Sequence, residues 1–339
     1  MKNKFNNNKA ARQQWRIIAL FCIFYLTLSG CASPYKKIYR VGILCGIDSL
    51  ASTIDGFKAK MSELGYKEGQ NILYDIQKTN IDPDGEKHMI ERFIGEKVDL
   101  IFAFPHDAAK TAKDNTQKSD MPVIFAYANI DDEDFVNSLL EPGGNITGVQ
   151  HPLKQLMVKR FEYLIEIDPT IERIWVGYDN SQPSFPHALE ALKLAAQAKQ
   201  ITLVEVLVDS PDTIKADFEQ REKSADIGID AILLTPSPVL QTQESWDIIK
   251  VFAEKHNLPV SANIYEQIKD GAVFHLGNDY IDVGKKAATL ADKILQGTPP
   301  SEIPVLSPED YLRINLVRAI TLGLNVPDGL LKQAVEIIR

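Results

Sequence analysis

The stretch that decides the fold runs from residue 39 to residue 76 and reads YRVGILCGIDSLASTIDGFKAKMSELGYKEGQNILYDI. Tyr39 to Leu44 and Ile72 to Ile76 are short apolar runs typical of buried strands. Between them, Ser52 to Leu64 has apolar residues at intervals of three and four, which predicts a helix with one buried face. Gly65 can take the left-handed conformation that ends such a helix. The stretch therefore predicts a βαβ unit, with Ile54, Phe57, Met61 and Leu64 packed on its sheet.

The same alternation continues along the chain, and it predicts parallel sheets covered by helices. With 45% hydrophobic and 24% charged residues, the 339-residue chain can bury the cores of two lobes. Helices are expected at Phe185 to Lys199, Gln243 to His256 and Val283 to Gln296. Further strands are expected at 100–103, 123–126, 146–149, 174–178, 202–208, 231–235, 260–262 and 272–276. Two successive sets of five strands indicate an α/β protein with two similar lobes.

The first thirty residues have the form of a signal peptide. Five basic residues precede an apolar run from Ile17 to Leu28, and the whole segment contains no acidic residue. This run is shorter than the roughly 20 residues that a spanning helix needs, so a permanent membrane helix is disfavoured. The run ends in Leu28-Ser29-Gly30-Cys31, which resembles a bacterial lipobox. We expect cleavage after residue 30, a lipidated Cys31 and a tether over residues 31–37.

Charge and cysteine content narrow the range of possible partners and of possible disulfides. Loss of residues 1–30, with their five basic residues, would change the formal charge from −9 to −14, which disfavours a nucleic-acid partner. Cys22 would leave with the signal peptide and Cys31 would carry lipid. Cys45 then remains alone, and no intramolecular disulfide is possible.

Several phrases occur in order along the mature chain: LGYKEGQNI (64–72), SLLEPGGNITGV (138–149), GNDY (277–280), DKILQG (292–297) with Pro300, INL (314–316), LGLNVP (322–327) and Leu330-Leu331. They resemble phrases of the ABC-transporter substrate-binding lipoproteins, a family that includes tryptophan- and tyrosine-binding members. The match covers residues from about Ile38 to the end. Most of these phrases are turn chemistry or helix ends and identify the family without contacting a ligand.

This resemblance implies the type 1 periplasmic-binding fold, with two lobes joined by a three-segment hinge. We expect the N-terminal lobe to hold residues 38–128 plus about 272–300. The C-terminal lobe would hold about 129–271 plus 301–339. The three crossing segments are expected near residues 128–131, 266–271 and 299–306.

In open α/β sheets ligands bind beyond the carboxyl ends of the strands, so the loops there hold the candidate ligand-binding residues. Ser49 and Ser52 lie where a strand gives way to a helix and could hold a carboxylate, or one of them could simply cap the helix. Asp107 could contact a ligand hydroxyl or amine, or cap the next helix. The same loops contribute the further candidates Asn129, Ser181 and Ser237.

The resemblance places Asp279 and Tyr280 beside the cleft. The carboxylate could pair with an ammonium group and the ring could stack on it, although Asp279 could instead be the N-cap of the following helix. Four further aromatic residues could line an apolar pocket or belong to the core: Tyr127, Tyr178, Phe185 and Tyr265.

One segment departs from the amino-acid-binding relatives. Where they carry an acid and an amide after a strand of the second lobe, this chain has Thr235-Pro236-Ser237-Pro238-Val239. The two prolines remove backbone N–H donors. An aromatic amino acid remains the leading ligand interpretation.

These observations predict an exported, lipid-anchored and monomeric solute-binding protein of an ABC importer, which delivers a small molecule to a permease and its ATPase. No catalysis, cofactor or metal is expected, because the six histidines form no pair at metal-ligand spacing and the chain has no Gly-x-Ser-x-Gly or phosphate loop. The alternative is a ligand-sensing lipoprotein subunit of a membrane signalling system. The anchor would lie at the periplasmic face of a membrane, or at the cell surface of a single-membrane source.

Overall fold

The first sheet contains the βαβ unit that the sequence predicts. A computed structural model describes residues 37–80, 82–130, 135–179 and 185–339. The five strands are parallel, in the order β2-β1-β3-β4-β5. Pairing places Tyr39 opposite Ile72 and Val41 opposite Leu100. The strands are β1 (Tyr39–Cys45), β2 (Ile72–Lys78), β3 (Leu100–Phe104), β4 (Val123–Ala128) and β5 (Ile146–Gln150).

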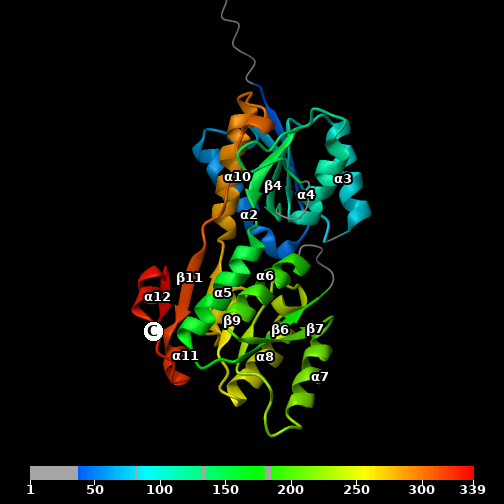
Figure 1. The fold of residues 1–339 in the computed structure, drawn as a ribbon. Coiled ribbons are helices and arrows are strands. Elements are labelled where there is room, and N and C mark those ends of the chain that lie inside the picture. Colours follow the sequence, from blue (N-terminus) through cyan, green and yellow to red (C-terminus); the bar gives the residue numbers. More distant parts are fainter. Residues whose placement is uncertain (1–36, 81, 131–134, 180–184) are drawn as a thin grey trace, which may run out of the picture. The chain divides into compact units, whose positions relative to one another are not determined.

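Helices cover both faces of this sheet (Figure 1). On one face α2 (Ser52–Glu63) and α10 (Tyr280–Leu295) bury their apolar residues, including Phe57 and Met61, against the strands. On the other face α3 (Pro83–Gly95) and α4 (His106–Thr116) enclose a second cluster. The sheet is thus buried on both sides, which is why its strands read as continuous apolar runs.

The second sheet has seven strands in the order β12-β11-β10-β9-β8-β6-β7. Its pairs are parallel except for the antiparallel pair of β10 and β11. The strands are β6 (Arg173–Tyr178), β7 (Thr202–Leu207), β8 (Ala231–Leu233), β9 (Val260–Ala262), β10 (Phe274–Gly277), β11 (Tyr311–Asn315) and β12 (Glu336–Ile338). Strands β11 and β12 were not among those expected from the sequence.

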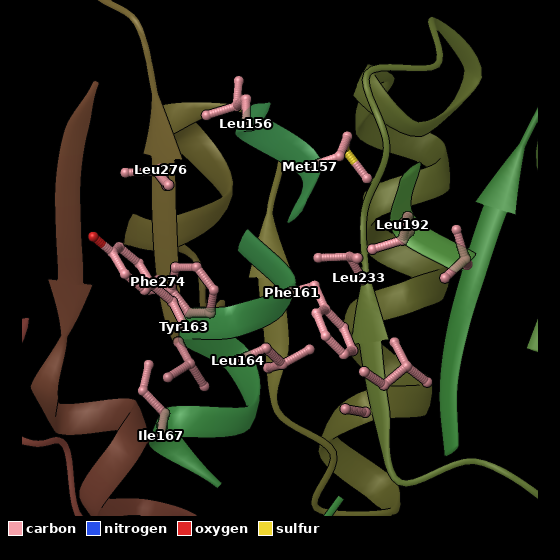
Figure 2. Packing of buried hydrophobic residues seen from close by; sticks show 14 of the residues in the cluster. Leu156, Met157, Phe161, Tyr163, Leu164, Ile167, Leu192, Leu233, Phe274 and Leu276 are labelled. Carbon is pink, nitrogen blue, oxygen red and sulfur yellow. The ribbon is translucent and has the colours of Figure 1, made fainter. Parts of the chain in front are cut away.

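Two helix layers enclose this sheet as well. On one face α5 (Leu153–Ile167) and α6 (Phe185–Ala198) share a core with β8 and β10, and Figure 2 shows α5 side chains among those of Phe274 and Leu233. On the other face lie α7 (Pro211–Arg221) and α8 (Gln243–Lys255). The shorter elements are η1 (Asp48–Leu50), η2 (Val239–Gln241), α9 (Tyr265–Lys269), η3 (Pro300–Glu302), α11 (Leu316–Thr321) and α12 (Asp328–Gln333).

The chain passes between the two lobes at places other than those expected. Strand β5 pairs with β4 in the first sheet, so the first lobe extends to about residue 150 rather than ending at 128. Strand β10 belongs to the second sheet, whereas α10 packs in the first lobe, which corrects the expected return at residue 272. Leu306 bridges to Val149 before β11 rejoins the second sheet. The three crossings therefore lie at 150–153, 277–280 and 306–311, because backbone pairing decides which sheet a strand joins.

Helices α2 and α10 approach each other closely through two glycines. A Cβ atom added to Gly56 would lie 2.0 Å from the carbonyl oxygen of Ile281. A Cβ added to Gly284 would lie 2.0 Å from the carbonyl oxygen of Thr53. The absence of both side chains therefore allows the two backbones to touch.

Candidate ligand-binding site

A cavity of about 210 Å³ lies at the carboxyl ends of strands from both sheets. This volume is below the roughly 300–1,000 Å³ of pockets for drug-sized ligands, so it suits one small molecule. The first lobe contributes the residues Ile47, Ser49, Leu50, Pro105, His106, Asp107, Tyr127, Asn129 and Tyr280. The second lobe contributes Leu153, Leu156, Arg160, Pro236, Pro238, Gln241, Asn263 and His275, and the crossing segments contribute His151, Gly277 and Asn278.

Arg160 of α5 brings a positive charge to this cavity. The residue is only 3% exposed. Its Nε donates a hydrogen bond to the carbonyl oxygen of Leu276 at 2.7 Å, and its Nη1 donates to Oδ1 of Asn263 at 3.0 Å. Burial lowers the pKa of Arg160 to about 10, which leaves it charged at neutral pH.

Two histidines near Arg160 are neutral at pH 7. Burial, followed by the positive charge of Arg160, lowers the pKa of His151 to about 4. Burial, Arg160 and then Arg313 lower the pKa of His275 to about 3. The His151 ring lies near the Asn278 side chain without a well-formed hydrogen bond to it. Arg160 therefore brings a buried positive charge to the cavity beside two neutral imidazoles.

An aromatic wall faces the cavity. Tyr127 makes edge-on contacts with His151 and Tyr280, with ring centroids 5.9 Å and 5.6 Å apart. Its φ of 55° is unusual for a residue with a side chain, and the β4–β5 register shifts at this point. Such irregularities redirect side chains beside functional sites. Burial raises the pKa of Tyr127, and its hydroxyl approaches that of Thr53 without a well-formed hydrogen bond.

The structure brings together five of the residues proposed from sequence. The lining includes Ser49 in η1, Asp107 in the first turn of α4 and Tyr280 in the first turn of α10. Tyr127 and Asn129, at and just after the end of β4, also line it. Each lies at or just after the end of a strand of the first sheet, or in the first turn of a helix there, as expected from the position of the strand ends.

Other proposed residues lie outside the lining. Ser52 begins α2. Asp279 is the N-cap of α10, where its carboxylate accepts hydrogen bonds from the N–H groups of Ile281 and Asp282 at 2.9 Å and 3.1 Å. Of the two interpretations of Asp279, ligand contact or helix N-cap, the structure shows the N-cap.

The remaining candidates belong to the second lobe or are not described. Tyr178 stacks on Phe185 in the core. Buried Ser237 donates to the carboxylate of Asp179. Tyr265 donates to Glu336, with Arg313 over its ring at 4.7 Å. Ser181 and Cys31 lie outside the described residues.

Sequence reasoning missed Arg160, His151, Asn263 and His275. One signal was available, because Arg160 occupies the stripe of α5 that buries Leu156 and Leu164, four residues away on either side. A charged residue at a core position rarely stays there without a role. His275 gave no such signal, since it lies inside a strand.

Two absences apply to the described part of the chain. There, no group of three or more His, Cys, Asp or Glu side chains is placed to hold a metal ion. No helix among these residues is both long and apolar enough to cross a membrane.

Comparisons with known proteins agree with this architecture. Residues 40–338 match the model of the family described as ABC transporter substrate binding protein. A tyrosine-binding protein of Clostridioides difficile strain R20291 is 28% identical over 273 residues, which span 80% of this chain and 76% of that protein.

Solved structures show the same fold. An ABC domain from Streptococcus pneumonia in complex with L-Trp has a TM-score of 0.73 at 23% identity, covering 89% of this chain and 100% of that one. A solute-binding protein from Bacillus halodurans C-125 with bound myo-inositol has a TM-score of 0.64 at 13% identity, covering 88% of this chain and 98% of that one. The two-lobed α/β fold predicted from the sequence is therefore confirmed.

Proposed function

Since the chain belongs to the family of ABC transporter substrate-binding proteins, we propose that its ligand is an amino acid, with an aromatic amino acid as the leading candidate. Proteins of this family work outside the cytoplasm and deliver a small molecule to the membrane permease of an ABC importer. They generally bind their ligand without transforming it. We extend this to the present chain and propose that it has no catalytic activity.

Cavity chemistry is the observation that carries the proposal. Among the described lining residues, Arg160 is the one arginine or lysine and Asp107 the one carboxylate. An α-amino acid presents the complementary pair of charges, and charge-assisted hydrogen bonds are about twice as strong as neutral ones. Tyr127 and Tyr280 add an aromatic wall suited to an aromatic side chain. The tyrosine-binding relative and the streptococcal complex with L-Trp support the same ligand class.

The placement of these groups explains how binding could drive closure. Arg160 belongs to the second lobe and Asp107 to the first, so a ligand that contacts both is bound fully only when the lobes close around it. The free energy of binding then stabilises the closed form over the open one, and the permease would recognise that form. The three crossings would act as the hinge.

A thermal-shift and calorimetric screen tests the ligand class. The probe protein is residues 31–339 with Cys31→Ser, because residues 39–339 form one compact unit. The panel contains the twenty amino acids, small sugars and nucleosides. A ligand at 100 times its dissociation constant should stabilise the folded state by about 2.7 kcal/mol. We expect tyrosine, tryptophan or phenylalanine to raise the melting temperature most. Stabilisation by sugars or nucleosides alone would reject an amino-acid ligand.

We also propose that Cys31 carries the lipid anchor and that the protein is monomeric. The basic, apolar and small-residue pattern before Cys31 supports the anchor. Expression of the full-length chain in a bacterial host should place it in the membrane fraction, and Cys31→Ser should move it to the soluble fraction or leave its signal peptide uncleaved. Equal membrane retention with normal processing in both forms would contradict the anchor. Size-exclusion chromatography with light scattering reports the oligomeric state.

A further inference from the structure

Arg160 is a buried cation without an ionic partner in the described part of the chain. No carboxylate of the described residues forms an ion pair with it, and its two hydrogen bonds are to neutral oxygens, those of Leu276 and Asn263. Asp310, the acid that acts electrostatically on Arg160, instead pairs with Lys159 at 3.4 Å. A guanidinium has five N–H donors, of which these bonds use two.

Such an arrangement is costly unless something supplies the missing charge. Burying a charge without a partner costs far more than burying a neutral polar group. Buried arginines are accordingly almost always paired. Since Arg160 lines the cavity, the partner that fits this position is an anion that enters the cavity.

The surroundings of Arg160 extend the same site. The amide nitrogen Nδ2 of Asn263 is buried and has no hydrogen-bond partner among the described residues, although Asn263 Oδ1 already accepts from Arg160. Asn263 itself is 7% exposed and lines the cavity. Gly277 leaves open the space beside Nη2 of Arg160, since a Cβ there would lie 3.5 Å from that atom and 2.8 Å from Nε2 of His275. Two unused donor groups, guanidinium and amide, therefore border one small space.

We infer that Arg160 and Asn263 form the carboxylate subsite of the cavity, so that the transported solute is a carboxylic acid held by its carboxylate at Arg160. A planar carboxylate matches the paired donors of a guanidinium, and the Asn263 amide supplies a third donor. This inference deepens the proposed function and rests on it for the delivery step. The carboxylate itself does not require the solute to be an amino acid.

Calorimetry with three matched probes tests the subsite: L-tyrosine, L-tyrosinamide and tyramine. The last two keep the ring and the ammonium group and lack the carboxylate. We expect wild type to bind L-tyrosine about 30-fold or more tightly than either, the loss typical of leaving a buried charge unpaired. The panel is extended with the other amino acids, with 4-hydroxyphenylpyruvate and 4-hydroxyphenylacetate as acids without an ammonium group, and with neutral sugars.

Two variants separate binding from folding. Arg160→Gln should remove the preference for the acid over its amide. Asn263→Asp is nearly isosteric and places an internal carboxylate next to Arg160. It should therefore weaken the binding of the acid, and leave the binding of tyramine unchanged or improve it. Lys159→Gln is the control, because it removes one positive charge from the neighbouring position of α5, on a side chain that is 42% exposed. We expect it to leave the preference unchanged.

The outcomes distinguish this inference from the amino-acid proposal. If only acids without an ammonium group bind, and both variants weaken them, the amino-acid proposal fails and the carboxylate subsite stands. If acid and amide bind wild type equally, or if Arg160→Gln weakens both to the same extent, Arg160 has only a structural role and the inference is overturned. Binding confined to ligands without a carboxylate, or no binding by any acid of the panel, overturns it as well.

Discussion

At the scale of the residue, one guanidinium sets the electrostatics of the cavity. No carboxylate among the described residues pairs with Arg160, and its charge adds to burial in lowering the pKa of both His151 and His275. A neutral imidazole is both donor and acceptor, so these rings can hydrogen-bond a ligand without adding charge. Asp279 shows the opposite case, because its carboxylate is already satisfied by the backbone of α10.

The depressed pKa of buried His275 predicts acid lability. Its pKa is about 3 in the folded protein and near 6.5 in an unfolded chain, so the unfolded state binds the proton first as the pH falls. Its contribution to stability is therefore complete above about pH 6.5 and declines as the pH falls toward 3. Between pH 7 and pH 5 this group alone should lower the free energy of unfolding by about 2 kcal/mol. His151, with a pKa of about 4, acts in the same direction.

Urea denaturation at pH 7 and pH 5 checks this prediction. The double variant His151→Asn, His275→Asn should lose much less stability over this interval than wild type. His88→Asn, at an exposed position of α3, should behave as wild type does. The charged groups that act on the two rings are Arg160, Arg313 and Asp310. Equal losses in the double variant and wild type would exclude the histidines as the cause.

At the scale of the element, the contact of α2 with α10 fixes one side of the cavity. Tyr280 lies in the first turn of α10, and Ser49 and Leu50 lie just before α2. The two glycines of this contact allow the backbones to approach, and no side chain could occupy the space they leave. The contact therefore determines the position of Tyr280 relative to η1.

Gly284→Ala should destabilise the protein by about 1–3 kcal/mol, because the new Cβ would meet the backbone oxygen of Thr53, which cannot move alone. Gly95→Ala is the matched control. Gly95 is also helical and its Cβ would have no atom within 4 Å, so the change should be neutral or stabilise by up to about 1 kcal/mol. Denaturant midpoints measure both. A Gly284→Ala midpoint equal to that of Gly95→Ala would show that the helices can separate without cost.

At the scale of the whole molecule, the elements could be predicted from the sequence far better than their assignment to lobes. Apolar runs locate β1 and β9 to within a residue or so, because strands buried on both faces carry their own signal. The membership of β5 and β10 could not be read in this way. It depends on which neighbouring strand supplies hydrogen bonds, a property of distant residues.

The cavity was predictable to the extent that it is built from loops after strands. Tyr127, Asn129 and Asp107 follow from that rule. Arg160 and His275 reach the cavity from inside a helix and a strand, where periodicity alone indicates core. Their role depends on the meeting of two lobes.

The interleaving of the lobes has a consequence for the order in which the protein can fold. Helix α10, which covers one face of the first sheet, is made only after ten strands of the chain, and η3 and Leu306 follow it. An emerging chain can cover this sheet face only in part, with α2, until roughly nine-tenths of it has been synthesised. We therefore expect the first lobe to gain its full stability late in synthesis, which would favour export of a chain that is still unfolded.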